Sequence, residues 1–177
     1  IIAPRPAICF GDTTTLYGPA LASSYLWSPG GDTTQNITVM PSTTTTYTLV
    51  AAGVCGKKQT LTKTITVNPL PTILINNGNP VSVCSGSSVA LTASGASTYV
   101  WSNSSTSNPI NVNPTVPTSY SVTGTDVNGC VNADTVTVQI NPLPTAVIST
   151  SNAAVCNGGT TTLHASGGGT YLWGDNT

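Results

Sequence analysis

The sequence predicts an all-β protein built from tandem two-sheet sandwich modules of about 70–75 residues, two of them complete and the third partial. Two observations support this prediction: a similar segment recurs three times, and short runs rich in Thr, Val, Ile and Tyr alternate between apolar and polar residues. In addition, no stretch places apolar residues at the 3.6-residue spacing of an amphipathic helix.

The repeat is defined by a cysteine-led segment that is followed by a Tyr-x-Trp motif. The three segments begin at Cys9, Cys84 and Cys156, and the three motifs end at Trp27, Trp101 and Trp173. The tryptophan spacings are 101−27 = 74 and 173−101 = 72 residues. The first two copies close with the same Asn-Pro-Leu-Pro-Thr phrase, which predicts a short, stiff and extended joint.

These markers divide the chain into module 1 (residues 1–69), module 2 (residues 70–142) and the N-terminal part of module 3 (residues 143–177). We expect module 3 to be truncated or completed by another chain. The opening residues contain neither an initiator methionine nor a signal peptide, so both ends are expected to be cuts through a longer polypeptide.

Each module is expected to contain six or seven short strands, separated by clusters of Gly, Pro, Asn and Ser. The expected strands of module 1 are 13–17, 24–28, 37–40, 47–50 and 64–67, and those of module 2 include 110–113, 120–123 and 135–138. The repeated tryptophan is expected in the core of each sandwich rather than on a carbohydrate-stacking surface, because its position on the strand is constant.

Composition excludes several classes of function. Only 5% of the residues are charged, and a net charge of −1 leaves no basic patch for nucleic acid. No run of about 18 apolar residues exists, so no membrane insertion is expected. A mean hydropathy of +0.14 with so little charge predicts self-association, or a surface protected by hydroxyl groups or glycans.

The cysteines predict disulfides within modules. Cys9 and Cys55 are separated by 55−9 = 46 residues, and Cys84 and Cys130 by 130−84 = 46. Equal spacing favours one bond per module over a metal site, which needs closely spaced ligands. Cys156 is expected to find its partner outside the chain, with an intermolecular bond as the alternative. Disulfides in turn imply an exported protein.

The combined pattern resembles bacterial Ig-like or PKD-like tandem repeats of large secreted or cell-surface Bacteroidetes proteins of the adhesin type. The resemblance rests on the Cys-x-Gly-x-Thr-x-x-Leu, Tyr-x-Trp-Ser-Pro-Gly-Gly and Asn-Gly-Cys motifs. It implies a non-catalytic structural or adhesive segment of an exported surface protein or extracellular filament. The alternative is a spacer or carbohydrate-binding accessory segment of a secreted hydrolase. The expected partners are neighbouring repeats, further copies of the chain and surface glycans.

Three Asp-Thr-x strings resemble the O-glycosylation acceptor pattern of the same bacterial group. They would make Thr13, Thr33 and Thr135 the acceptors of a glycoprotein.

Residues capable of catalysis are few, and no enzyme activity or cofactor is expected. His164 is the single histidine and is expected on the surface. The acidic residues are scattered over turns and strand edges, which disfavours a catalytic carboxylate pair; they are Asp12, Asp32, Asp126, Asp134 and Asp175. Asp126 and Asn128 could hold a weak Ca²⁺, but a glycine-containing hairpin turn is the preferred interpretation, so no metal is expected.

Overall fold

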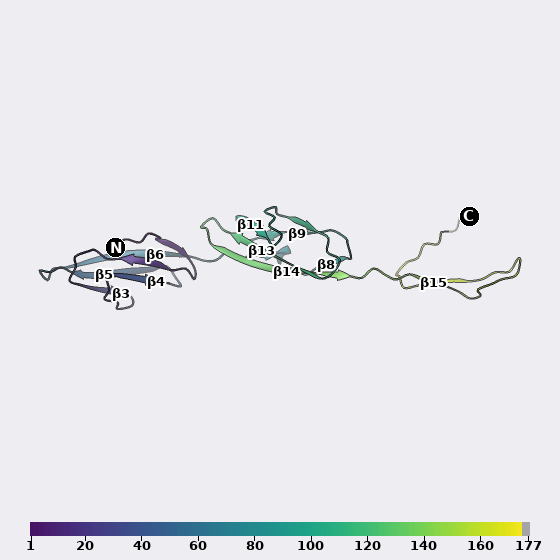
Figure 1. Ribbon diagram of the computed structural model, residues 1–177, viewed down its shortest axis with the longest axis horizontal. Coiled ribbons are helices and arrows are strands. Elements are labelled where there is room, and N and C mark those ends of the chain that lie inside the picture. The colour runs from purple at the N-terminus through teal and green to yellow at the C-terminus, as the bar shows by residue number, and fades with distance from the viewer. Residues whose placement is uncertain (175–177) are drawn as a thin grey trace.

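The computed structural model describes residues 1–174 and shows three units that follow one another along an extended molecule (Figure 1). Apart from one 3-10 turn, η1 (Asn76–Gly78), every regular element in the described part of the chain is a β-strand, which confirms the predicted all-β class. In this part of the chain, no helix is long and apolar enough to cross a membrane.

Module 1 is a sandwich of two sheets. One sheet has the strand order β1-β6-β5-β3 and the other pairs β2 with β4. Its strands are β1 (Ala7–Cys9), β2 (Thr14–Tyr17), β3 (Ser24–Ser28), β4 (Asn36–Val39), β5 (Thr45–Ala52) and β6 (Lys58–Asn68). The first strand runs parallel to the last, whereas all other pairs are antiparallel. This is an Ig-like arrangement, with the tryptophan strand on the same sheet as the final hairpin.

Module 2 repeats this topology. Its large sheet has the order β11-β13-β14-β8, and the opposite layer contains the pairs β12-β9 and β10-β7. The strands are β7 (Leu74–Ile75), β8 (Val81–Cys84), β9 (Val89–Leu91), β10 (Ala93–Ser94), β11 (Thr98–Trp101), β12 (Ile110–Val112), β13 (Thr118–Thr125) and β14 (Val131–Asn141). β8 runs parallel to β14, as β1 does to β6.

A tryptophan lies at the centre of each of these two cores. Trp27 and Trp101 are 0% and 2% exposed, and their indole N–H groups donate hydrogen bonds to the carbonyl oxygens of Thr34 (2.9 Å) and Ser107 (3.0 Å). Because the polar edge of each ring is satisfied, the whole ring can be buried. No disulfide joins the two sheets of either module, so apolar packing holds each sandwich together.

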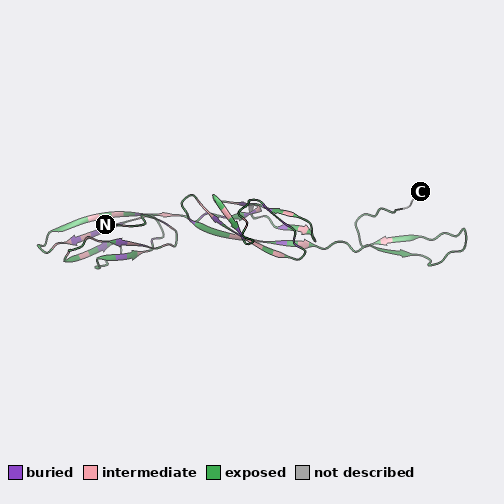
Figure 2. Ribbon diagram, turned by 45° about the horizontal axis from the view of Figure 1, so that its top comes forward, coloured by how far each residue is buried: buried purple, intermediate pink, exposed green. Residues whose placement is uncertain are grey.

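The described part of module 3 is one antiparallel pair, β15 (Val147–Thr150) and β16 (Leu163–Ser166). It occupies the place of β7 and β10 in the repeat, but Ile148 is 65% exposed where its counterpart Ile75 is 1% exposed. Figure 2 shows the same contrast: buried residues (purple) occur in modules 1 and 2 but not in the described part of module 3.

The expected core position of Trp173 is wrong for this structure, since Trp173 is 45% exposed. The cause is local: within residues 143–174 there are no counterparts of β13 and β14, the strands that bury Trp101. The short loop beside it is nevertheless preserved. The Tyr171 hydroxyl donates to the Gly168 carbonyl (2.8 Å), as the Tyr99 hydroxyl does to Ala96 (2.9 Å).

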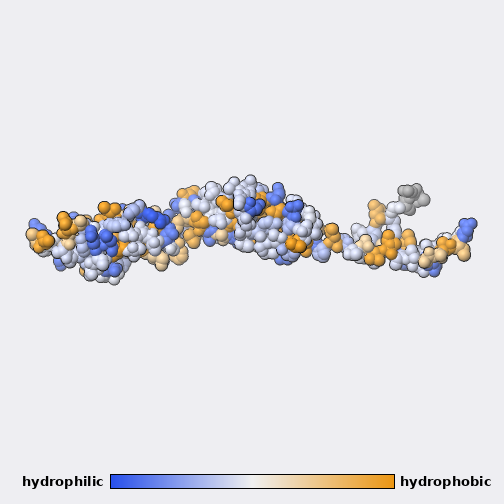
Figure 3. All heavy atoms as spheres, viewed as in Figure 1, coloured by the Kyte–Doolittle hydropathy of each residue, from blue (hydrophilic) through white to orange (hydrophobic). Residues whose placement is uncertain are grey.

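The face drawn in Figure 3 is mostly weakly polar, with scattered hydrophobic patches in orange and smaller hydrophilic ones in blue. Thr and Ser side chains cover much of both large sheets and bond across strands. Examples are the hydroxyl pairs Thr46–Thr64 at 2.9 Å and Ser119–Thr137 at 2.8 Å. Cross-strand hydroxyl pairs stabilise a sheet without using charge.

Candidate functional site: the junction between modules 1 and 2

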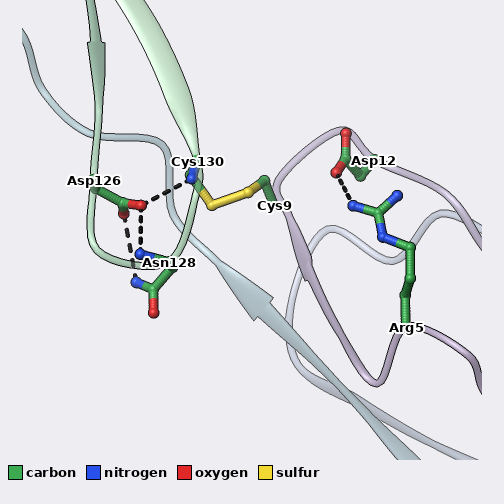
Figure 4. Close-up of a disulfide and its surroundings, with 6 residues drawn as sticks. All are labelled: Arg5, Cys9, Asp12, Asp126, Asn128 and Cys130. Atoms are coloured by element: carbon green, nitrogen blue, oxygen red, sulfur yellow. Dashed lines mark hydrogen bonds and ion pairs between the residues drawn. A yellow bond between two sulfur atoms is a disulfide. The ribbon is translucent and has the colours of Figure 1, made fainter. Parts of the chain in front are cut away.

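A disulfide connects the two complete modules. Cys9, at the end of β1, is bonded to Cys130, immediately before β14, with 5.5 Å between the two Cα atoms (Figure 4). The predicted pairs Cys9–Cys55 and Cys84–Cys130 are therefore wrong. Cys55, Cys84 and Cys156 are free thiols, and all three are exposed.

Strand length explains why pairing within a module fails. Cys9 is paired with Asn68, the last residue of β6, whereas Cys55 precedes Lys58, the first residue of that strand. β6 has 11 residues, so these ends are about 35 Å apart at roughly 3.3 Å per residue. A disulfide needs its Cα atoms within about 7 Å.

The same separation applies to module 2. Cys84 is paired with Asn141 at the end of β14, and Cys130 precedes Val131 at its beginning. Because the modules follow one another in the same direction, the far end of β6 meets the near end of β14. The bond between modules therefore joins ends that the topology brings together.

The hairpin between β13 and β14 holds Cys130 in place. One carboxylate oxygen of Asp126 accepts hydrogen bonds from the backbone N–H groups of Asn128 and Cys130, both at 2.8 Å. Gly129 takes a positive φ of 81°, and its N–H donates to the Asp126 carbonyl at 3.1 Å. The carboxylate is thus engaged in forming the turn, which agrees with the preferred turn interpretation of this loop.

A tight turn presents Cys9 from the other side. The Asp12 N–H donates to the Cys9 carbonyl at 2.9 Å, and Gly11 lies between them with a φ of 88°. The guanidinium of Arg5 forms an ion pair with the Asp12 carboxylate at 2.8 Å. Both partners are about half exposed, so this pair contributes little stability and chiefly orients the loop.

The linker is attached to module 2 by hydrogen bonds. The Asn132 side-chain N–H donates to the Pro71 carbonyl of the linker at 2.9 Å. Directly after the linker, the N–H of Ile75 in β7 donates to the Asp134 carboxylate at 3.0 Å. The covalent linker, these bonds and the disulfide give the junction three kinds of restraint.

The structure does not bring the other polar candidates together into a catalytic or metal site. His164 lies exposed within β16, opposite Ser149. Among the described residues, no group of three or more His, Cys, Asp or Glu side chains could hold a metal ion. Asp175 lies outside the described residues. In the core of module 1, desolvation by burial raises the pKa of the Tyr47 hydroxyl.

The three predicted glycosylation sites are exposed. Thr13 lies on the loop before β2, Thr33 lies on the loop before β4, and Thr135 lies within β14. The buried rings of Trp27 and Trp101 offer no face to a sugar, whereas Trp173 is partly accessible.

No protein-family model and no curated protein sequence matches this chain. Among solved structures, it is similar to the three N-terminal domains of the highly immunogenic outer capsid protein of bacteriophage RB49. That likeness has 15% identity and a TM-score of 0.41, covering 85% of this chain and 60% of the other. The insect immune protein hemolin gives 17% identity and a TM-score of 0.39, covering 76% and 44%.

A Ca²⁺-stabilised adhesin that helps an Antarctic bacterium reach out and bind ice gives 14% identity and a TM-score of 0.34. The coverage is 81% of this chain and 49% of the adhesin. The chain thus spans between about two fifths and three fifths of these three structures.

Sequence reasoning missed the junction because equal spacing was taken as equal position. The Gly53 N–H donates to the Lys57 carbonyl at 2.9 Å, and the Asp126 N–H donates to the Cys130 carbonyl at 3.0 Å. Lys57 is therefore the counterpart of Cys130, and the counterpart of Cys55 is Asn128. The differing sequences Val54-Cys55-Gly56 and Asn128-Gly129-Cys130 already indicated that the two cysteines stand at different positions of the hairpin.

Proposed function

We propose that this chain is a non-catalytic structural segment of an exported bacterial surface protein or extracellular filament, in which modules are joined end to end as a stiff strut. The observation that carries this proposal is the Cys9–Cys130 bond across the junction. A bond in that place joins neither pair of sheets within a module and restrains the angle between the modules.

The bond also changes how tension passes along the chain. Force applied at the two ends enters at residues 1–9, crosses the disulfide and leaves through residues 130–177. The intervening segment, which contains all strands from β2 to β13, is removed from the path of the force. A surface protein under shear benefits from such protection, because most of the core strands are spared from direct pulling.

The low charge and the many Thr and Ser hydroxyls support an extracellular setting, and the disulfide requires an oxidising one. The expected partners are neighbouring modules and surface glycans. Glycans on Thr13, Thr33 and Thr135 would shield a surface that has almost no charge, and all three side chains are exposed.

Single-molecule stretching between the chain ends tests the mechanical role. With 121 residues of sequence separation closed by the bond, we expect the oxidised chain to extend about 400 Å less than the reduced chain, at roughly 3.5 Å per residue. Cys84→Ser serves as the matched control and is expected to behave like the wild type. Equal extension of the oxidised and reduced chains would contradict the proposed path of force.

Two further results decide the setting and the absence of catalysis. On cells that make the parent protein, antibodies to this chain are expected to label intact cells, and labelling only after permeabilisation would refute a surface location.

Turnover of a glycan substrate that is lost on His164→Ala would refute the non-catalytic assignment.

A further inference from the structure

We propose that Cys84 is one half of a second junction disulfide, and that its partner is the hairpin cysteine of a module of the same kind that follows module 2. This inference deepens the proposed strut function and rests on it. Cys84 is a free, exposed thiol that takes no part in the first junction. At the second junction it would form the disulfide that Cys9 forms at the first.

The backbone setting of Cys84 repeats that of Cys9. Each is the last residue of a strand parallel to the final strand of its module, paired with Asn141 and Asn68, respectively. The residue after each cysteine donates its N–H to that asparagine, from Ser85 at 3.3 Å and from Phe10 at 2.9 Å.

The turn that follows is also the same. The Ser87 N–H donates to the Cys84 carbonyl at 3.0 Å, as the Asp12 N–H donates to Cys9, and the glycine between them, Gly86, has a φ of 73°. The direction in which the backbone presents the thiol is therefore common to both sites. At the first junction this direction leads to Cys130.

The surface around Cys84 repeats as well. A shallow groove at this end of module 2 is lined by Ser85, Val116, Ile140 and Leu143. The corresponding groove of module 1 is lined by Phe10, Thr43, Val67 and Leu70, the residues at the same repeat positions. The end of module 2 that carries Cys84 thus has the same groove as the end of module 1 that carries Cys9.

The linker sequence indicates which segment would lie against the groove and Cys84. The Asn-Pro-Leu-Pro sequence at 68–71 delivers module 2, hairpin first, to Cys9, and the identical sequence stands at 141–144. A following module that starts from the same stiff joint places its own hairpin against Cys84. Two thiols then become one disulfide, and the two electrons and two protons pass to a small-molecule disulfide such as oxidised glutathione, which is reduced to two thiols.

The test duplicates module 2 within the intact chain by inserting a second copy of residues 70–142 after Pro142, which keeps the Asn-Pro-Leu-Pro sequence at both junctions. In the inserted copy, Cys84→Ser leaves a single Cys84, and Val127→Ile marks the hairpin peptide by mass. The protein is refolded with oxidised and reduced glutathione, alkylated and mapped by peptide mass spectrometry.

We expect Cys84 to be bonded to the inserted hairpin cysteine, with its alkylation reduced about tenfold relative to Cys55 in the same molecule, because the linker makes the reaction intramolecular. Replacing the inserted cysteine (C130S) is expected to restore alkylation of Cys84. The inference is overturned if Cys84 stays as reactive as Cys55 while the Cys9–Cys130 bond forms. Loss of both bonds would instead refute the first junction, and with it the proposed function.

A second measurement on the unmodified chain applies if the duplicated chain does not fold. A synthetic peptide of residues 124–132, mixed with the chain and oxidised glutathione, is expected to couple faster to Cys84 than to Cys55, because Cys84 directly precedes Ser85 of the groove. Coupling that is no faster at Cys84 than at Cys55 also overturns the inference.

Discussion

Cys130 owes its position to a single carboxylate. Asp126 accepts two backbone hydrogen bonds inside the hairpin, one of them from Cys130 itself, and thereby fixes the thiol that crosses the junction. Hydrogen bonds to a charged group contribute about 1.5–3 kcal/mol each in favourable settings, and less where water competes. Asp126 is thus a positioning residue for the disulfide.

Replacing Asp126 with Ala is expected to make the Cys9–Cys130 bond about tenfold easier to reduce in a glutathione buffer, since the hairpin then samples conformations that separate the two thiols. Asp126→Asn, which keeps an acceptor oxygen, should recover part of the effect. Asp32→Ala, an exposed aspartate away from the junction, is the control. A redox equilibrium unchanged by Asp126→Ala would mean that the turn forms without the carboxylate.

At the scale of elements, the close approach of the linker to β10 depends on glycine. Gly95 follows β10 with a φ of 97°, and a Cβ there would overlap the carbonyl oxygen of Thr72 in the linker. Gly167 has the same relation to Thr145 in module 3. The same backbone contact, between the start of a module and the glycine that follows β10 or its counterpart β16, therefore occurs in modules 2 and 3.

Gly95→Ala is expected to lower the free energy of unfolding of module 2 by about 3 kcal/mol or more, through backbone strain and the overlap with Thr72. Gly86→Ala is the matched control: its φ is also positive, but a Cβ meets nothing within 4 Å, so about 1 kcal/mol is expected. Urea denaturation followed by tryptophan fluorescence measures both. Equal losses would show that the contact with Thr72 is unimportant.

The sequence predicted the elements better than their connections. The strand at 24–28 matches β3, and the repeat unit and the all-β class follow from alternation and spacing. The disulfide could not be found from the 46-residue spacing, because a spacing along the chain contains no information about strand direction. In each module, the two cysteines lie at opposite ends of the long final strand, β6 or β14. Trp173 was misplaced because burial depends on strands absent from residues 143–174.

For the whole molecule, the disulfide links the stability of the two modules. It closes a loop with a sequence separation of 121 residues, and such a loop removes about 4–5 kcal/mol of chain entropy from the unfolded state in the simple model. Because each module has a separate core, little else couples them.

Cys9→Ser is therefore expected to lower the midpoint of denaturation and to separate the unfolding of module 1 from that of module 2 in calorimetry. Cys84→Ser removes the counterpart thiol, which is free and exposed, and should leave the profile of the wild type. Identical profiles for Cys9→Ser and wild type would show that the bond does not couple the modules.

The most direct test of the central claim, a covalent lock across the junction, is peptide mapping of the non-reduced chain after alkylation of free thiols. We expect one cross-linked peptide pair, containing Cys9 and Cys130, and alkyl groups on Cys55, Cys84 and Cys156. Cross-links of Cys9 to Cys55 and of Cys84 to Cys130 would contradict it, because they would place each bond within a module and leave the junction unlocked.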